Sequence, residues 1–296
     1  MNRQSLVVEI EKQLSVKSGN PVKILKSTPV GGGCIHHAQK LVTSIGDFFL
    51  KWNNSGASDI FIREAESLSE LSLSGTGNLI IPRVTLSAEI SKTPGYLLLE
   101  YLEPGSGDRQ DEIRLGRGLA EIHLFRGRYF GFHHDNHCGS TPQNNAWKDK
   151  WCDFYGTNRI LFLMNLLSMQ GGFSWQDAHV FEKLVEKLPS LIPSDSYPSM
   201  IHGDLWSGNY MMTTRGPALI DPAACYADRE MEFGILTLFG GFTSYFWQGY
   251  NEVFPLPNGW KERNPLYQLY HLLNHNYLFG GSYGNQALNI ARYYTQ

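Results

Sequence analysis

The chain has few cysteines, and their spacing suits neither a disulfide scaffold nor a clustered metal site. Among its 296 residues only Cys34, Cys138, Cys152 and Cys225 are cysteines, and no two of them form a CxxC pair. A chain of this length can bury an adequate core without covalent cross-links. We therefore interpret all four as free thiols.

The chain also lacks an excess of charge of either sign. It has 25 basic and 28 acidic residues, a formal net charge of -3 and no basic tract. Proteins that bind nucleic acids neutralise phosphates with clustered basic side chains, so we do not expect a nucleic-acid partner. With 42% hydrophobic and 18% charged residues, the composition is that of a globular protein and not of a disordered one.

Long hydrophobic runs are absent. The most apolar segment is ILFLMNLLSM at residues 160–169, which is shorter than the roughly 20 residues of a membrane-spanning helix. The first residues, MNRQSLVVEIEKQL, carry charges throughout and lack the apolar stretch of a signal peptide. We expect a cytoplasmic protein without a membrane partner.

In the first hundred residues, short runs rich in β-branched and aromatic residues alternate with turn signals, which predicts an antiparallel sheet. The pair Gly46-Asp47 suits a hairpin turn, and the helical spacing after Ser58, a candidate cap, predicts one main helix ending near Gly75. The five predicted strands cover residues 22–27, 38–44, 47–53, 83–90 and 95–102.

The pattern becomes helical after the Pro-Gly-Ser-Gly segment at residues 104–107, which suits a hinge. We therefore predict an α+β fold with two lobes, residues 1–102 and residues 103–296, the second larger and mostly helical. Its main predicted helices cover residues 112–125, 145–169, 175–188 and 264–280, and shorter strand-like segments cover 199–204, 209–214 and 217–222.

The stretch HGDLWSGN at residues 202–209 is the strongest functional motif. Asp204 ends an apolar strand, and Asn209 follows it after four intervening residues. Kinase catalytic loops use this spacing, because the Asp meets the acceptor hydroxyl while the Asn holds a metal ion. Twelve residues beyond Asn209, Asp221 ends another predicted strand, where a second metal-binding carboxylate belongs.

The alternative interpretation is a simple turn, with Gly203 and Gly208 supplying backbone freedom and Asn209 a cap. The HGD tripeptide alone would favour that interpretation. The second aspartate at hairpin distance favours a metal site, because unpaired carboxylates at buried strand ends are costly unless a cation is bound.

The amino-terminal half offers residues for a nucleotide. Lys51 ends an apolar run inside a predicted strand, where an unpaired ammonium would be unfavourable, and Glu64 on the following helix is a partner for it. A surface lysine at a strand end is the simpler alternative.

Two backbone segments are also candidates for nucleotide contact. Between the first two strands lie Gly31, Gly32 and Gly33, which suit a phosphate-binding loop. A flexible turn would have the same sequence. The backbone from Glu100 to Leu102 lies at the lobe junction and suits the edge of an adenine ring.

The loop HHDNHC at residues 133–138 resembles a zinc cluster, but its adjacent histidines lack the paired spacing of structural zinc sites. We interpret it as a polar loop that lines an acceptor cleft. Cys34, next to the glycines, is either an oxidisable thiol or a small buried hydrophobic residue.

The chain resembles the fructosamine and ketosamine kinase family, relatives of the aminoglycoside and choline kinases on the protein-kinase-like fold. The resemblance covers nearly the full length. Besides HGDLWSGN and IDPA, it depends on FGFHHDNHCGSTPQNNAW from Phe130, DFYGTNRI from Asp153, YADREMEFGILTLFGGF from Tyr226 and YQLYHLLNH from Tyr267.

This resemblance implies that ATP and magnesium are used to phosphorylate O3 of a ketosamine formed by glycation of an amine, either free or as glycated lysine in a protein. It implies that Asp204 is the catalytic base, that Asn209 and Asp221 hold the metal, and that Lys51 and Glu64 position the phosphates.

For the acceptor, the resemblance implies Trp206 and His275. A tryptophan face beside the base can orient a sugar ring, although Trp206 would equally pack the loop and His275 would equally be a core histidine. Asp228 and Glu230 are interpreted either as attracting an aminated acceptor or as solvated surface charges.

One departure from the protein kinases is that DPA replaces their DFG motif, and no APE motif follows. This favours a small acceptor. The alternatives are a kinase for another hydroxylated amine, such as an aminoglycoside or choline, and a catalytically silent nucleotide-binding module.

Overall fold

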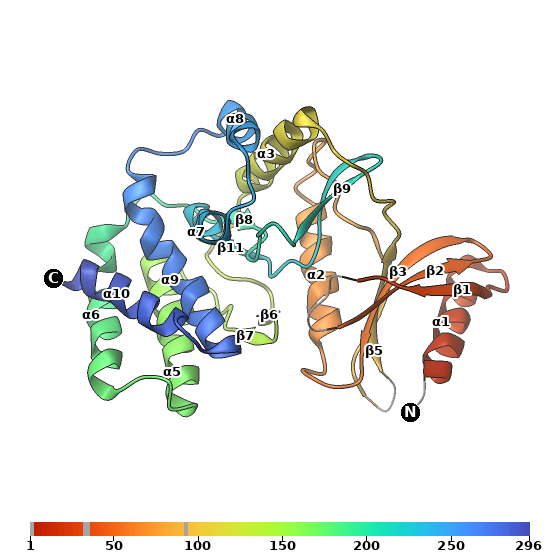
Figure 1. The fold of residues 1–296 in the computed structure, drawn as a ribbon, viewed down its shortest axis with the longest axis horizontal. Helices are drawn as coiled ribbons and strands as arrows, with labels where there is room; N and C mark the ends of the chain where they lie inside the picture. Colours follow the sequence, from red (N-terminus) through yellow and green to blue (C-terminus); the bar gives the residue numbers. More distant parts are fainter. Residues whose placement is uncertain (1–2, 32–35, 92–93) are drawn as a thin grey trace.

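The computed structural model describes residues 3–31, 36–91 and 94–296. They form two lobes side by side, with the sheet in one lobe and most of the helices in the other (Figure 1). The five-stranded sheet has the order β1-β2-β3-β5-β4, and all neighbouring strands are antiparallel, as predicted. Its strands are β1 (Ile24–Pro29), β2 (His37–Thr43), β3 (Gly46–Asn53), β4 (Val84–Ala88) and β5 (Gly95–Glu100).

The hairpin between β2 and β3 turns earlier than the sequence suggested. Thr43 pairs with Gly46, so the two turn residues are Ser44 and Ile45, and the prediction of a Gly46-Asp47 turn is wrong. Thr43 stabilises this turn because its hydroxyl donates to the carbonyl of Gly46 at 2.7 Å.

The sheet is covered on both faces, which explains why β5 is apolar at nearly every position. Successive side chains of a strand point to opposite faces. Leu97 and Leu99 pack with α2 (Ile60–Ser72), whereas Tyr96 and Leu98 lie in the cluster formed with α1 (Arg3–Ser18).

The sequence did not predict α1. This helix buries only a narrow stripe, made by Leu6, Ile10 and Leu14 at four-residue intervals, while Val8 and Val16 are exposed. The small lobe therefore has a second helix besides the expected α2, which begins one residue later than a cap at Ser58 predicts and has no side-chain cap.

The larger lobe is mainly helical, as predicted. The prediction missed α7, α8 and α10, which are short or follow glycine-rich turns. The helices are α3 (Arg109–Leu124), α4 (Trp151–Asp153), the π-helical η1 (Phe154–Leu161), α5 (Phe162–Met169), α6 (Trp175–Leu191), α7 (Glu230–Phe239), α8 (Ser244–Val253), α9 (Trp260–Phe279) and α10 (Tyr283–Thr295).

Three small antiparallel hairpins and ladders lie between the helices and the cleft. They are β6 (Asn136–Cys138) with β7 (Thr141–Gln143), β8 (Ser199–Ile201) with β11 (Cys225–Ala227), and β9 (Tyr210–Thr213) with β10 (Gly216–Leu219). The last two ladders hold the loop that contains HGDLWSGN.

Backbone hydrogen bonds and shared core residues join the two lobes in addition to the covalent chain. In the linker, Gly105 donates its N–H to Met212 of β9, and Glu103 accepts from Thr214. Leu71 and Leu79, which precede the linker in sequence, are part of the core of the larger lobe. Within the described ranges, no helix has both the length and the apolar content needed to cross a membrane.

Candidate active site

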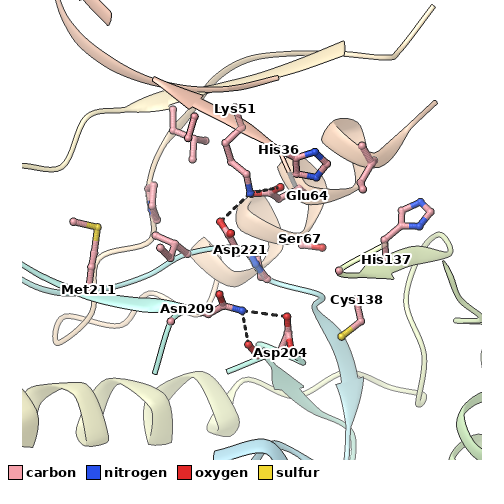
Figure 2. A pocket seen from close by; sticks show the side chains of 18 of the residues that line it. His36, Lys51, Glu64, Ser67, His137, Cys138, Asp204, Asn209, Met211 and Asp221 are labelled. Atoms are coloured by element: carbon pink, nitrogen blue, oxygen red, sulfur yellow. Dashed lines mark hydrogen bonds and ion pairs between the residues drawn. The ribbon is translucent and has the colours of Figure 1, made fainter. Parts of the chain in front are cut away.

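A cavity of about 500 Å³ lies between the lobes and is lined by residues of both. Lys51 and Glu64 reach it from the small lobe, and Asp204, Asn209 and Asp221 reach it from the larger one (Figure 2). The residues that the sequence singled out separately therefore share one cavity, whose size suits a small-molecule site.

Lys51 lies between two carboxylates. Its Nζ atom donates to both oxygens of Glu64, at 2.8 and 2.9 Å, and to Oδ1 of Asp221 at 2.9 Å. Burial by itself would lower the pKa of Lys51, but the carboxylates of Asp221 and Glu64 outweigh burial and raise it. Lys51 is therefore a fixed cation, although only 7% of the residue is exposed.

The same contacts affect the pKa values of the two carboxylates. Burial works against ionisation of Asp221, but the Lys51 ammonium outweighs it and keeps the pKa of Asp221 below its usual value. The Asp221 side chain is still 44% exposed toward the cleft. Glu64 lies deeper, and burial raises its pKa despite the Lys51 contact.

The β9–β10 hairpin brings Asp221 back beside Asn209, as the strand-turn-strand pattern predicted. The strands pair from Tyr210 with Leu219, and Ile220 donates its N–H to the carbonyl of Asn209 at 3.0 Å. Asp221 has a positive φ of 57°, a left-handed conformation that is uncommon for a residue other than glycine. Such strain is found where the surrounding structure holds a functional side chain in place.

Asp204 lies at the opposite wall of the cavity. Burial raises its pKa to about 8, and the nearby charges of Asp221 and Glu232 add to the effect, while hydrogen bonds from Cys138 and Asn209 oppose it. A carboxylate with a pKa near neutrality is better suited to accept a proton than an ordinary surface aspartate. Gly203 before it has φ 83°, and a Cβ there would lie 2.1 Å from the carbonyl of Ala223, so glycine is required.

Glu232 of α7 fixes the backbone that carries Asp204, and the sequence analysis missed it. Its fully buried carboxylate accepts the N–H of His202 at 2.5 Å and that of Gly203 at 3.1 Å. Its only sequence signal is its place in the stretch YADREMEFG, which carried the family resemblance.

The oxygens of Asn209 and Asp221 fit a divalent cation. Asn209 donates Nδ2–H to the carbonyl and to Oδ2 of Asp204, at 2.7 and 3.1 Å. Oδ1 of Asn209 and Oδ2 of Asp221 accept no hydrogen bond from the described residues. Such free oxygens are the ligands that Mg²⁺ prefers.

A metal ion here would also need oxygens from a ligand. In the described part of the chain, no three His, Cys, Asp or Glu side chains converge closely enough to hold a metal ion. Mg²⁺ is commonly held by one or two protein side chains together with phosphate oxygens and water. The donor set therefore fits a metal ion that is bound together with a nucleotide.

The cavity also has apolar walls, which suit a flat base. Its walls include Val30, Ala38, Leu99, Met211 and Ile220. Three residues that the sequence proposed for nucleotide contact, Gly31, Glu100 and Leu102, also line the cavity.

The backbone of Leu102 has no backbone hydrogen-bond partner among the described residues, so its N–H and C=O can meet the edge of a ring. Two of the three proposed loop glycines, Gly32 and Gly33, lie outside the described residues, as does Cys34.

Both proposed acceptor residues also line the cavity. Trp206 is 39% exposed. His275 donates Nδ1–H to the carbonyl of His271 at 2.8 Å, and its ring lies 4.7 Å from that of Phe239. Burial lowers the pKa of His275, so this ring is neutral at pH 7.

The histidine loop borders the cavity and also contacts the small lobe. His137 lines the cavity, but its Nε2 lies 3.3 Å from Asp59, before α2. The exposed His133 and His134 lie within 3.6 Å of Glu70 and Glu66 on the same helix. The loop therefore joins the larger lobe to α2 in addition to bordering the cavity.

Asp228 and Glu230 correct another expectation. They neither face the cleft nor lie at the surface, because both are buried: Glu230 pairs with Arg263 at 2.6 Å, and Asp228 accepts the N–H of Glu230 at 2.8 Å. Both interpretations offered by the sequence are wrong for these two side chains.

The fold and the arrangement of charges across the cleft place the chain among the phosphotransferases with a protein-kinase-like fold. A family model described as fructosamine kinase matches residues 6–296. The chain belongs to the fructosamine kinase family, which makes it an ATP-dependent phosphotransferase with a sugar hydroxyl as acceptor.

Individual relatives agree with this assignment. The chain is 38% identical to a probable ketoamine kinase of Synechocystis sp., over 96% of this chain and 95% of that protein. It is 35% identical to a chloroplastic protein-ribulosamine 3-kinase of Oryza sativa subsp. indica, over 94% and 81%. A crystal structure of a putative fructosamine-3-kinase from Haemophilus somnus superposes with a TM-score of 0.85 at 25% identity, covering 98% of this chain and all of that one.

Proposed function

We propose that the protein is a ketosamine 3-kinase, which transfers the γ-phosphoryl group of ATP to O3 of the sugar of a fructosamine or ribulosamine. One observation carries the proposal: in a member of the fructosamine kinase family, Lys51 with its two carboxylate partners lines the same cavity as the hydrogen-bonded pair of Asp204 and Asn209. The names of the relatives, ketoamine kinase and ribulosamine 3-kinase, support this acceptor class.

Residues 1–102 are proposed to bind ATP. The apolar walls hold the adenine, while the backbone from Glu100 to Leu102 meets its edge. Gly31, together with Gly32 and Gly33, covers the phosphates, and Lys51, held by Glu64, neutralises their charge. Residues 103–296 supply the catalytic groups and the acceptor site.

Asn209 and Asp221 are proposed to hold Mg²⁺, which neutralises the charge that develops on the phosphates. In the structure, Asp221 pairs with Lys51 at 2.9 Å. One carboxylate oxygen and the Asn209 amide oxygen remain for the ion.

Asp204 is proposed to act as the general base. It accepts the proton of the acceptor hydroxyl while that oxygen attacks the γ-phosphorus, the bond to the β–γ bridging oxygen breaks and ADP leaves. Asn209 holds one oxygen of the Asp204 carboxylate at 3.1 Å. Glu232 keeps the loop in place through the backbone of His202 and Gly203.

Trp206 and His275 are proposed to line the acceptor end, with the indole face against the sugar. Because Trp206 is partly exposed, the amine substituent of the acceptor can leave the cavity beside it. This opening would accommodate a small glycated amine as well as a glycated lysine side chain on a protein.

A turnover screen tests the proposal. Purified protein with MgATP is offered a fructosamine, a ribulosamine, an aminoglycoside and choline, and the products are identified by mass spectrometry and by the phosphorus coupling of the sugar carbon. We expect phosphate on O3 of the ketosamines. Turnover of the aminoglycoside or choline alone would replace the proposed acceptor, and nucleotide binding without any turnover would favour a silent module.

A further inference from the structure

One hydrogen bond crosses from the larger lobe to the start of α2, the helix that carries Glu64. Nε2 of His137, in β6, lies 3.3 Å from Oδ1 of Asp59, the residue directly before α2. An ionised carboxylate only accepts hydrogen bonds, so Nε2 carries the proton and donates it. The His137 side chain is only 13% exposed, and β6 lies next to α2 (Figure 1). The proposed mechanism gives this contact no role.

Asp59 does not perform the usual task of an aspartate at this position. A residue directly before a helix commonly accepts a backbone N–H of the first turn, but no side-chain bond of this kind is found for Asp59 in the described chain. Its Oδ2 instead accepts from Nε of Arg63 at 2.8 Å, which leaves Oδ1 for His137. Burial opposes ionisation, but the hydrogen bonds from Arg63 and His137 outweigh it and lower the pKa of Asp59. The carboxylate therefore serves a contact with the other lobe.

The strand that carries His137 is held within the larger lobe. Asn136, its neighbour in β6, is 2% exposed and donates Nδ2–H to the carbonyl of Ala224 at 2.9 Å. Oδ1 of Asn136 in turn accepts from Asn145 at 2.8 Å. Successive side chains of a strand point to opposite faces. Asn136 therefore contacts the segment that follows Asp221, while His137 contacts α2.

These contacts link the two carboxylates that hold Lys51. Glu64 lies on α2, shortly after Asp59, and Asp221 lies shortly before the carbonyl that Asn136 binds. Lys51 donates to both carboxylates, at distances of 2.8 and 2.9 Å. A shift of α2 against the larger lobe would move Glu64 relative to Asp221 and would displace the ammonium. In an active site, a displacement of about 1 Å can reduce the rate strongly.

We propose that His137 is a positioning residue, which fixes α2 through Asp59 so that Glu64 holds Lys51 against the phosphates of ATP. The inference rests on the proposed role of Lys51 in the proposed kinase. It gives the histidine loop a share in the use of ATP. A residue of the larger lobe thereby determines where a side chain of the small lobe lies.

The competing explanation is that His137, which lines the cavity, contacts the acceptor directly. Asp59 distinguishes the two explanations, because it is not among the described residues that line the cavity. Loss of the Asp59 carboxylate would leave a direct contact between His137 and the acceptor intact. Under the positioning role, loss of either partner has the same effect.

His134 provides a matched control in the same loop. Its Nδ1 lies 3.3 Å from Glu66 of α2, but its side chain is 55% exposed and is not among the described residues that line the cavity. Exposed ion pairs contribute little, because water and salt screen them. Any effect that arises from every contact between the loop and the helix would appear in variants of both histidines.

The test measures kcat and KM for ATP and for the acceptor, corrected for the folded fraction, in the wild type, His137→Leu, His137→Gln, Asp59→Ala and His134→Leu. We expect His137→Leu to lower kcat/KM for ATP about tenfold, as for a lost hydrogen bond to a charged group, while KM for the acceptor stays within about twofold. His137→Gln, whose amide can donate from the place of Nε2, should recover most of this loss. His134→Leu should match the wild type.

Asp59→Ala removes the same contact from the side of the small lobe, and it keeps the test decisive if His137→Leu does not fold. It should lower kcat/KM for ATP by a similar factor. The double variant of both residues should be no worse than the weaker single variant, because the contact is already broken. Losses that multiply, a change confined to KM for the acceptor, or no recovery in His137→Gln would overturn the proposal. Equal losses in His137→Leu and His134→Leu would also overturn it.

Affinity for a non-hydrolysable ATP analogue with Mg²⁺, measured by calorimetry, separates this inference from the proposed function, because no acceptor takes part. If no ketosamine is phosphorylated, the proposed acceptor is wrong. A several-fold weaker affinity in His137→Leu and Asp59→Ala, with His134→Leu unchanged, would still support the positioning of Lys51. Equal affinities in all variants would overturn the role of His137 even in an active ketosamine kinase.

Discussion

Residue by residue, burial determines the properties of the site as much as residue type does. Asp204 and Asp221 have the same side chain, yet burial raises the pKa of the first to about 8, while the Lys51 ammonium keeps the pKa of the second low. The sequence assigned different roles to them from motif spacing alone. Their different environments support that division, because a base must accept a proton and a metal ligand must stay ionised.

Replacement of Asp204 tests its role most directly. We expect Asp204→Asn to lower kcat by roughly two to four orders of magnitude, because the amide cannot accept a proton. Binding of an ATP analogue should persist, since Lys51, Glu64 and Asp221 are untouched; calorimetry measures it. The exposed Asp149→Asn serves as the matched control and should keep full activity. Turnover near the wild-type rate in Asp204→Asn would remove Asp204 from the mechanism.

Among the elements, α7 shows how a distant helix can control the catalytic loop. Glu232 accepts two backbone N–H groups of the loop at residues 202–203, while Glu230 on the same helix pairs with Arg263 of α9. One turn of helix therefore carries one carboxylate for the site and one for stability. Nothing in the local sequence separates the two.

A pair of variants separates these roles. Glu232→Gln should lower kcat at least tenfold, because the amide leaves one loop N–H unpaired and lets the backbone of Asp204 shift. Glu230→Gln should lower the melting temperature, since it weakens a buried ion pair, but should keep kcat. Rates and thermal unfolding measured on both variants check this. Similar kcat values in the two variants would contradict the anchoring role of Glu232.

The elements also show the limits of sequence patterns. Its continuous run of apolar residues predicted that β5 is a central strand, and the periodic apolar residues predicted α2 and α9. The helix α1 escaped prediction because its buried stripe is a single residue per turn. The role of Glu232 could not be predicted, since it depends on contacts with a loop far away in the sequence.

At the scale of the whole molecule, the two lobes share buried residues, so the stability of each lobe depends on the other. Leu71 and Leu79 of the first lobe lie in the core of the second. The same core contains neutral histidines. Burial lowers the pKa of His271 to about 3, with Arg159 and His275 adding to the effect, and it also lowers the pKa of His123, against the opposing influence of Glu232.

Because burial lowers the pKa of both histidines, we expect the free energy of unfolding to fall in mild acid. Above pH 6.5 both are neutral in the folded and unfolded states and have no effect. Below about 6.5 the unfolded chain binds protons that the folded chain refuses, so unfolding becomes easier by about 1.4 kcal/mol per pH unit for each such histidine. For His271 this continues down to its folded pKa of about 3.

Urea unfolding at pH 7.5, 6.5 and 5.5 measures the slope. We expect His271→Gln to have a smaller loss of stability between pH 6.5 and 5.5 than the wild type, whatever its absolute stability. The exposed His179→Gln should keep the wild-type slope. An unchanged slope in His271→Gln would show that His271 does not contribute.

The sequence by itself predicted the five strands of the sheet, the helix α2 and the main helices of the larger lobe, and it singled out Lys51, Glu64, Asp204, Asn209 and Asp221 as candidate site residues. These follow from periodicity and from motif spacing, which are local properties of a chain. Only the tertiary structure decided which carboxylates are buried and that Glu232 holds the catalytic loop. Burial and contact between distant segments arise when separate elements pack together, so no single stretch of sequence contains them.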